Sequence, residues 1–171
     1  ESVLASTVEI QVALDDGHMT PALCGIVVGG VLTLFSMWWI YFDEPVHQLL
    51  TSNRVGFLWG YGHFFVFAAT AAVGAGLETS ADQLLGHAHL SAWTSGLVFT
   101  VPVAIYVLLV WALQVRPMHA GAAYTHSYPL AAVAMVVLSA SGAAVLLTGL
   151  VLAALVAATA IEHDLGLVTR N

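Results

Sequence analysis

His63 is the residue of this sequence best suited to chemistry, because it stands well inside an apolar stretch, residues 55–78, that ends on a glutamate. An ionisable side chain at the depth of a lipid bilayer costs at least about 2.5–3.5 kcal/mol, so it needs a polar partner or a function. Histidine also gains and loses a proton near neutral pH, which suits it to accepting and passing protons. The stretch therefore predicts a polar site inside a membrane.

Three further polar residues reach a depth similar to that of His63 when each helix is counted at about 1.5 Å per residue. All four come out roughly 18–22 Å below the outer face of a hydrocarbon core about 30 Å thick. The other three are Glu1, Ser36 and Tyr106. We expect His63 to pair with Glu1 across helices, with Ser36 or Tyr106 completing its hydrogen bonds. The alternative is that these groups only hold the bundle together.

A second polar layer is expected nearer the outside, with Glu9 in the first helix and Glu78 at the rim. Two carboxylates and a histidine at stepped depths are what a proton or cation path requires. We therefore include Glu9 and Glu78 in the candidate site around His63.

His87 and His89 are weak candidates for a metal site in a polar segment, residues 79–92. A His-x-His pair directs both rings to one face only if the segment is extended, and solvated loop histidines are the more ordinary interpretation. A haem would need a second histidine inside a span, and His63 has none. With Cys24 as the single cysteine there is also no internal disulfide or thiolate cluster, and we predict no bound cofactor.

The composition places these residues in a membrane protein. The chain has 171 residues, of which 60% are hydrophobic and only 8% charged, whereas a soluble domain carries about 25% charged residues. Its three basic residues are all arginines, so there is no basic patch of the kind that binds nucleic acid.

Apolar runs of membrane length predict an all-α, polytopic bundle of about five to six membrane helices. Residues 21–42, 55–78 and 93–115 are complete spans, with Pro102 expected to kink the third without ending it. Residues 1–14 would make a helix of about 21 Å and look like the second half of a span whose start is missing.

The last apolar region, residues 128–161, would be about 51 Å long as one helix, which exceeds a single span. We predict a break near residues 139–142, where the sequence is rich in serine and glycine. With that break, Arg54, Arg116 and Arg170 lie on one side of the membrane, and the positive-inside rule makes that side cytoplasmic.

Small and polar residues mark one face of two predicted spans and should let neighbouring helices approach closely. In the first complete span they are Gly25, Gly29, Thr33, Ser36 and Asp43. In the second they are Gly56, Gly60, His63, Thr70 and Gly74, and this stripe should face the interior of the bundle.

The stretches WWIYFDEP (38–45) and LWGYGHFFVFAATAAVGAGLE (58–78), with the opening ESVLA, resemble the bacterial low-temperature-requirement A family. These are polytopic membrane proteins considerably longer than this chain, and the likeness covers residues 1 to about 115, with the remainder similar in hydropathy only. The matching residues are Glu1, Trp38, Trp39, Tyr41, Asp43, Gly62, His63 and Glu78.

The resemblance implies a single transmembrane domain that forms the C-terminal half of a longer protein, because a Gly-Glu-Ser type motif of the family maps its acid onto Glu1. It also implies a bacterial cytoplasmic membrane. The expected partners are the lipid bilayer and either the missing N-terminal half or neighbouring membrane subunits, with no role for nucleic acid.

Three functions fit these observations. The leading hypothesis is proton- or ion-coupled transport through His63, Glu1 and Glu9. One alternative is a structural or accessory subunit of a larger membrane complex. The other is an intramembrane enzyme that acts on lipid, with Ser36, His63 and Glu1 as nucleophile, base and orienting acid.

Overall fold

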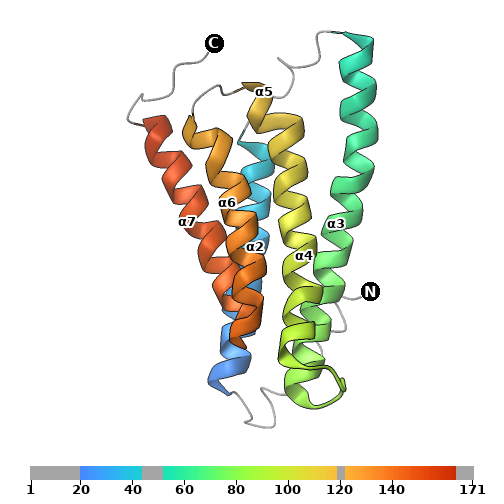
Figure 1. Ribbon diagram of the computed structural model, residues 1–171, viewed down its shortest axis with the longest axis vertical. Coiled ribbons are helices and arrows are strands. Elements are labelled where there is room, and N and C mark those ends of the chain that lie inside the picture. The colour runs from blue at the N-terminus through green and yellow to red at the C-terminus, as the bar shows by residue number, and fades with distance from the viewer. Residues whose placement is uncertain (1–19, 44–51, 119–121, 165–171) are drawn as a thin grey trace.

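The computed structural model of the chain describes residues 20–43, 52–118 and 122–164, and the regular structure in these residues is entirely helical (Figure 1). The helices are α2 (Pro21–Phe42), α3 (Asn53–Leu85), α4 (Ala92–Val110), the π-helix η2 (Trp111–Val115), α5 (Arg116–Met118), α6 (Ala122–Leu138), the 3₁₀-helix η3 (Ser139–Ser141) and α7 (Ala144–Asp164).

Local sequence signals set several of the helix ends. The side-chain oxygens of Thr20, Ser52 and Ser91 each accept a hydrogen bond from the backbone N–H three residues further on, which caps the starts of α2, α3 and α4. Helix α3 ends at Gly86, whose φ of 79° lies in the left-handed region that glycine adopts without strain.

Four helical segments of the described chain are long and apolar enough to cross a membrane, which confirms the predicted all-α polytopic bundle. They are Pro21–Phe42, Asn53–Leu85, Ala92–Met118 and Ala144–Ile161. Helix α4 continues through Pro102 as expected. Residues 1–14, which were expected to complete a further span, lie outside the described residues.

The predicted break in the last apolar region is confirmed. Helix α6 gives way to a single 3₁₀ turn, Ser139–Ser141, and Gly142 follows with a φ of 74°. Because both serine hydroxyls donate to carbonyls three residues earlier, at 2.6 Å and 2.7 Å, the turn satisfies its own backbone and reverses the chain between α6 and α7.

Two predicted loop boundaries were wrong. Helix α3 runs on to Leu85 rather than stopping at Glu78, because the hydroxyls of Thr79 and Ser80 donate to carbonyls of their own helix instead of forming a turn. Helix α6 begins at Ala122 rather than at residue 128, and it accommodates Pro129 in its early turns.

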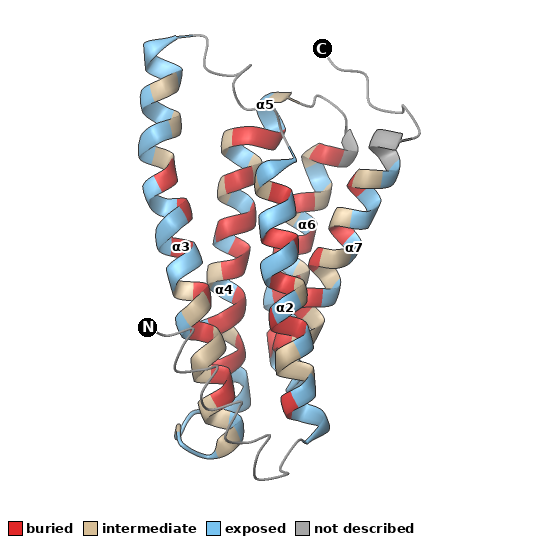
Figure 2. Cartoon of the chain, turned by 180° about the vertical axis from the view of Figure 1, so that it is seen from behind, coloured by how far each residue is buried: buried red, intermediate tan, exposed pale blue. Residues whose placement is uncertain are grey.

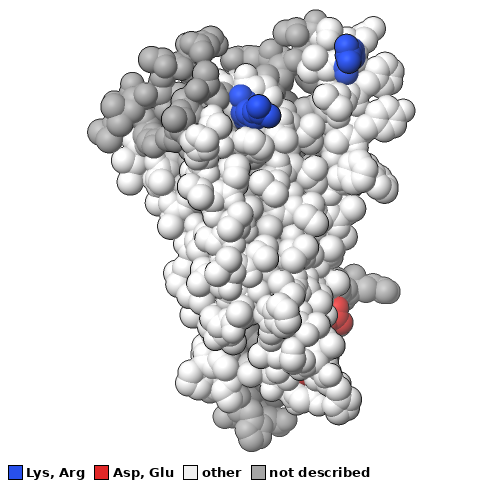
Figure 3. All heavy atoms as spheres, viewed as in Figure 1, with Lys and Arg blue, Asp and Glu red and all other residues white. Residues whose placement is uncertain are grey.

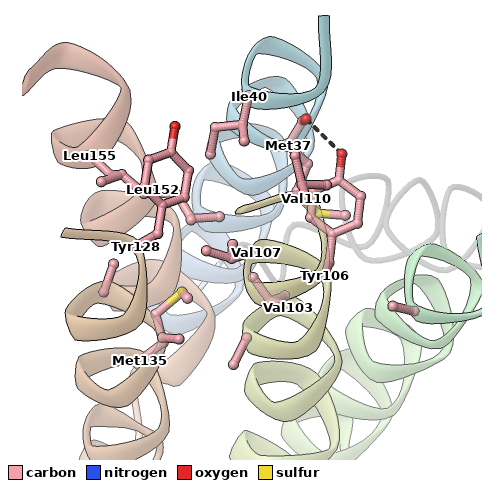
Figure 4. Packing of buried hydrophobic residues seen from close by; sticks show 14 of the residues in the cluster. Met37, Ile40, Val103, Tyr106, Val107, Val110, Tyr128, Met135, Leu152 and Leu155 are labelled. Atoms are coloured by element: carbon pink, nitrogen blue, oxygen red, sulfur yellow. Dashed lines mark hydrogen bonds between the residues drawn. The ribbon is translucent and has the colours of Figure 1, made fainter. Parts of the chain in front are cut away.

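The helices alternate in direction, so that α2, α4 and α7 start at the lower end of Figure 1 while α3 and α6 start at the upper end. Helix α3 packs mainly on α4, and α2 packs mainly on α7. The buried residues line the inner faces of the helices, as Figures 2 and 4 show. The upper part of α3 stands apart from its neighbours and is largely exposed (Figures 1 and 2).

The small-residue face of α2 forms a close contact with α7. A Cβ placed on Gly29 would lie 2.5 Å from the carbonyl oxygen of Val145, and one on Gly149 would lie 2.5 Å from the carbonyl oxygen of Gly29. Thr33 and Ser36 are buried along the same face, whereas Asp43 is exposed. The prediction of close packing through this face is confirmed for its central residues.

The predicted interior stripe of α3 is wrong in part. His63 is buried, but Gly60 and Thr70 are exposed, and nothing lies within 4 Å of a Cβ placed on Gly60. The hydroxyl of Thr70 donates to the Val66 carbonyl of its own helix, so it needs no partner inside the bundle. Helix α4 instead packs on a rotated face of α3.

Candidate functional site

His63 is buried on α3 and has one ring nitrogen bonded and the other free. Its Nδ1 lies 2.6 Å from the carbonyl oxygen of Trp59, one turn earlier in the same helix. Because a carbonyl oxygen can only accept, Nδ1 carries the proton and donates it. In the neutral ring Nε2 is then a lone-pair acceptor, and this buried atom has no hydrogen-bond partner among the described residues.

Aromatic rings surround the imidazole of His63. The ring centroid of Trp59 lies 3.9 Å from that of His63, Tyr41 of α2 lies at 5.7 Å and Phe67 lies at 6.0 Å. These three rings pack against the imidazole at tilted or edge-on angles of 43–77°. The indole nitrogen of Trp59 is itself buried without a partner.

The π-helix η2 lies at the same level of the bundle as His63. A Cβ placed on Gly62 would lie 2.7 Å from Leu113 Cδ1, so the residue before His63 packs against the middle of η2. The next residue of η2, Gln114, is 1% exposed, and its Oε1 is a buried acceptor without a partner. Short π-helical turns occur frequently at functional sites.

Sequence reasoning passed over Gln114 and Trp59. Gln114 could have been found, because it is the sole amide side chain in the apolar run 93–115, where an amide needs a hydrogen-bond partner. Trp59 carried no comparable signal, since a tryptophan near the start of a span ordinarily marks the membrane interface.

Two of the predicted partners of His63, Ser36 and Tyr106, lie where α2 meets α4. The hydroxyl of Tyr106 donates to the carbonyl oxygen of Met37 at 2.9 Å, which brings Tyr106 to the residue after Ser36 (Figure 4). His63 contacts the ring of Tyr41, which lies one helical turn beyond Met37 on α2, and it makes no hydrogen bond with Ser36 or Tyr106.

Of the three carboxylates of the candidate site, the structure describes only Glu78. Glu1 and Glu9 lie outside the described residues, so the pairing of Glu1 with His63 stays a prediction. Glu78 is half-buried on α3, about 22 Å along the helix from His63.

A cavity of about 270 Å³ lies between α2 and α3 beside the aromatic rings that contact His63. Tyr41 and Phe67 line it together with Thr70 and Tyr106, and Met37 forms part of its wall. A second cavity, of about 160 Å³, lies at the lower end of the bundle, where the hydroxyl of Ser95 donates to that of Ser80.

His87 and His89 are exposed in the turn after α3. Within residues 20–43, 52–118 and 122–164, no three histidine, cysteine or acidic side chains come close enough together to hold a metal ion. The weak metal candidates therefore gain no third ligand from the part of the chain that is described.

The described charges lie near the ends of the bundle. Arg54 and Arg116, the two described basic residues, lie at the upper end of Figure 3, and acidic atoms appear only toward the lower end of that view. The broad surface between them carries no charged side chain on this face.

Membrane-length helices, an uncharged belt and a histidine buried within one of the spans define a multi-pass membrane protein. The chain belongs to the bacterial low temperature requirement A (LtrA) family, whose sequence pattern matches residues 1–161. That match carries the likeness from residue 115 into α7. Comparison with curated proteins and with solved structures gave no match.

Proposed function

We propose that this protein transports protons, or a solute coupled to protons, across the bacterial cytoplasmic membrane, and that His63 is the group that accepts the proton. The observation that carries the proposal is the Nε2 atom of His63, which is buried in a membrane span and holds a lone pair without a partner in the described residues. Placing an ionisable side chain at this depth costs free energy, so its presence points to a function.

A purely structural role explains this histidine less well. A core histidine that stabilises a bundle makes hydrogen bonds through both ring nitrogens, because an unsatisfied buried acceptor costs about 1–3 kcal/mol. His63 leaves its Nε2 without a partner among the described residues, although Tyr41, Trp59 and Phe67 pack against its ring. A buried acceptor that stays free suits a group that alternates between neutral and protonated states.

The lipid-enzyme alternative loses its central contact. It required the Ser36 hydroxyl to bond to His63, and His63 makes no such hydrogen bond.

An accessory-subunit role has one observation in its favour. The first part of α3 exposes Phe57, Tyr61 and Phe64, which are 65%, 72% and 69% exposed. Lipid or a neighbouring subunit would cover this surface.

We propose that the upper end, with Arg54 and Arg116, faces the cytoplasm, because arginines concentrate on the cytoplasmic side of short loops. On this orientation His63 lies nearer the cytoplasmic surface than the middle of α3. A proton entering from the cytoplasm would then meet His63 early on its path.

Flux across a liposome membrane tests this function. The intact protein is reconstituted into liposomes that hold a pH-sensitive dye, and the medium outside the liposomes is then acidified. Wild type should acidify the lumen faster than empty liposomes, and His63→Asn should abolish the difference. Asparagine can still donate to the Trp59 carbonyl but cannot be protonated. His87→Asn is the matched control because His87 is exposed in a turn. Equal flux in wild type and His63→Asn would refute the proposal.

A further inference from the structure

We propose that His63, Gln114 and Trp59 together hold one ordered water molecule, and that this water is the immediate donor of the proton that His63 accepts. The inference rests on the proposed function and adds to it a positioning residue, Gln114, and the chemical species that reaches His63. Three buried polar atoms of the site have no hydrogen-bond partner in the described residues: His63 Nε2, Gln114 Oε1 and Trp59 Nε1.

Helix geometry puts Gln114 and His63 on one side of the contact between α3 and η2. Gly62 and Leu113 meet at that contact, and each is followed directly by one of the two polar residues. The next residue along a right-handed helix turns by about 100°, and because η2 continues α4, which runs opposite to α3, both turns lead to the same side.

Helix α2 closes that side. The Tyr41 ring of α2 contacts the His63 ring, and Met37 of α2 accepts the hydrogen bond from Tyr106 of α4. Gln114 and His63 therefore both face the space between α2, α3 and η2. The indole of Trp59 is tilted against the imidazole with the ring centroids 3.9 Å apart, and its N–H is a buried donor beside His63.

The three atoms match the hydrogen-bonding capacity of one water molecule. Nε2 and Oε1 are acceptors and take the two O–H groups of a water, while the indole N–H is a donor and gives to the water oxygen. Buried waters typically make about three such bonds to groups that would otherwise be unsatisfied. An ammonium-type ion fits less well, because it has no acceptor for the Trp59 N–H.

The proton step balances at this water. When the water is protonated to hydronium, one of its O–H bonds breaks as the N–H bond at Nε2 forms, which leaves neutral water and an imidazolium. Nδ1 keeps its own proton and its bond to Trp59 throughout. Gln114 acts through the water, since its amide does not exchange a proton with His63.

Solid-state NMR of the intact, ¹⁵N-labelled protein in liposomes tests this site. Wild type should give a magnetisation-transfer peak between bound water and His63 Nε2. Gln114→Met, which keeps much of the volume but removes the acceptor, should reduce that peak and slow flux by at least about tenfold. Gln114→Glu, which restores an acceptor oxygen, should recover the peak.

The matched control is Thr148→Val. Thr148 carries another fully buried hydroxyl without a partner, but it lies on α7 in its first turns at the lower end of the bundle. This substitution should leave the Nε2 peak unchanged. A wild-type protein without the peak, or a Gln114→Met protein that keeps it, would overturn the inference. A peak that depends on Gln114 in a protein without proton flux would instead refute transport and leave the water site standing.

Discussion

The Nδ1 atom of His63 lies 2.6 Å from the carbonyl oxygen of Trp59, and this one contact fixes the character of both ring nitrogens. The carbonyl determines that Nδ1 is the donor, so Nε2 is the atom left to take up a proton. The same contact holds the ring against the indole, with the centroids 3.9 Å apart. The geometry of one helical turn thus selects the tautomer on which the proposed transport depends.

Tyr106→Phe should destabilise the bundle by about 1–2 kcal/mol, because it removes the hydroxyl that donates to Met37 and so links α4 to α2. Unfolding of the purified protein in detergent measures the change. Tyr61→Phe is the matched control, since Tyr61 is 72% exposed, and it should unfold like wild type. A Tyr106→Phe protein as stable as the control would show that this bond adds nothing to the packing of α2 on α4.

Gly29→Ala should destabilise the bundle by about 1–3 kcal/mol, since the added Cβ would meet the backbone of α7 at 2.5 Å. Gly60→Ala, where nothing lies within 4 Å, should be neutral or gain up to about 1 kcal/mol from helix propensity. Thermal unfolding of both variants in the same detergent gives the comparison. Equal stabilities would contradict the close approach of α2 and α7.

Thiol labelling should place the two ends of α3 on opposite sides of the membrane. In a Cys24→Ala background, Ser52→Cys lies at the start of α3 beside Arg54, and His89→Cys lies in the turn after its end. A reagent that cannot cross the membrane should label His89→Cys in intact cells and Ser52→Cys only after lysis. The reverse pattern would put the arginine-bearing end outside.

Much of the fold could be predicted from the sequence because it depends on long apolar runs and on a few residues with strong local preferences. The reversal at Gly142 is such a case, since serines and a glycine that accepts a positive φ interrupt an apolar region too long for one span. The end of α3 was missed because Thr79 and Ser80 resemble turn residues, yet each hydroxyl bonds within its own helix.

The site was harder to predict because it depends on how helices pack. Composition and length identified His63, but its neighbours follow from the rotation and register of α3 on α4, which the contact of Gly62 with Leu113 sets. The π-helical turn that carries Gln114 has no signature in the sequence. Depth counting grouped Tyr106 with Ser36 on α2, and the hydrogen bond from Tyr106 to Met37 does join these two helices next to Ser36.

The most direct test of the account is the tautomer of His63, read from the ¹⁵N spectrum of the intact protein in liposomes. The two ring nitrogens of a neutral imidazole give distinct ¹⁵N signals according to which one carries the proton. We expect Nδ1 to be protonated and Nε2 to be free of a proton, and acidification should then add a proton at Nε2. A ring protonated at Nε2 when neutral, or one that stays neutral on acidification, would contradict the proposal that His63 accepts the transported proton.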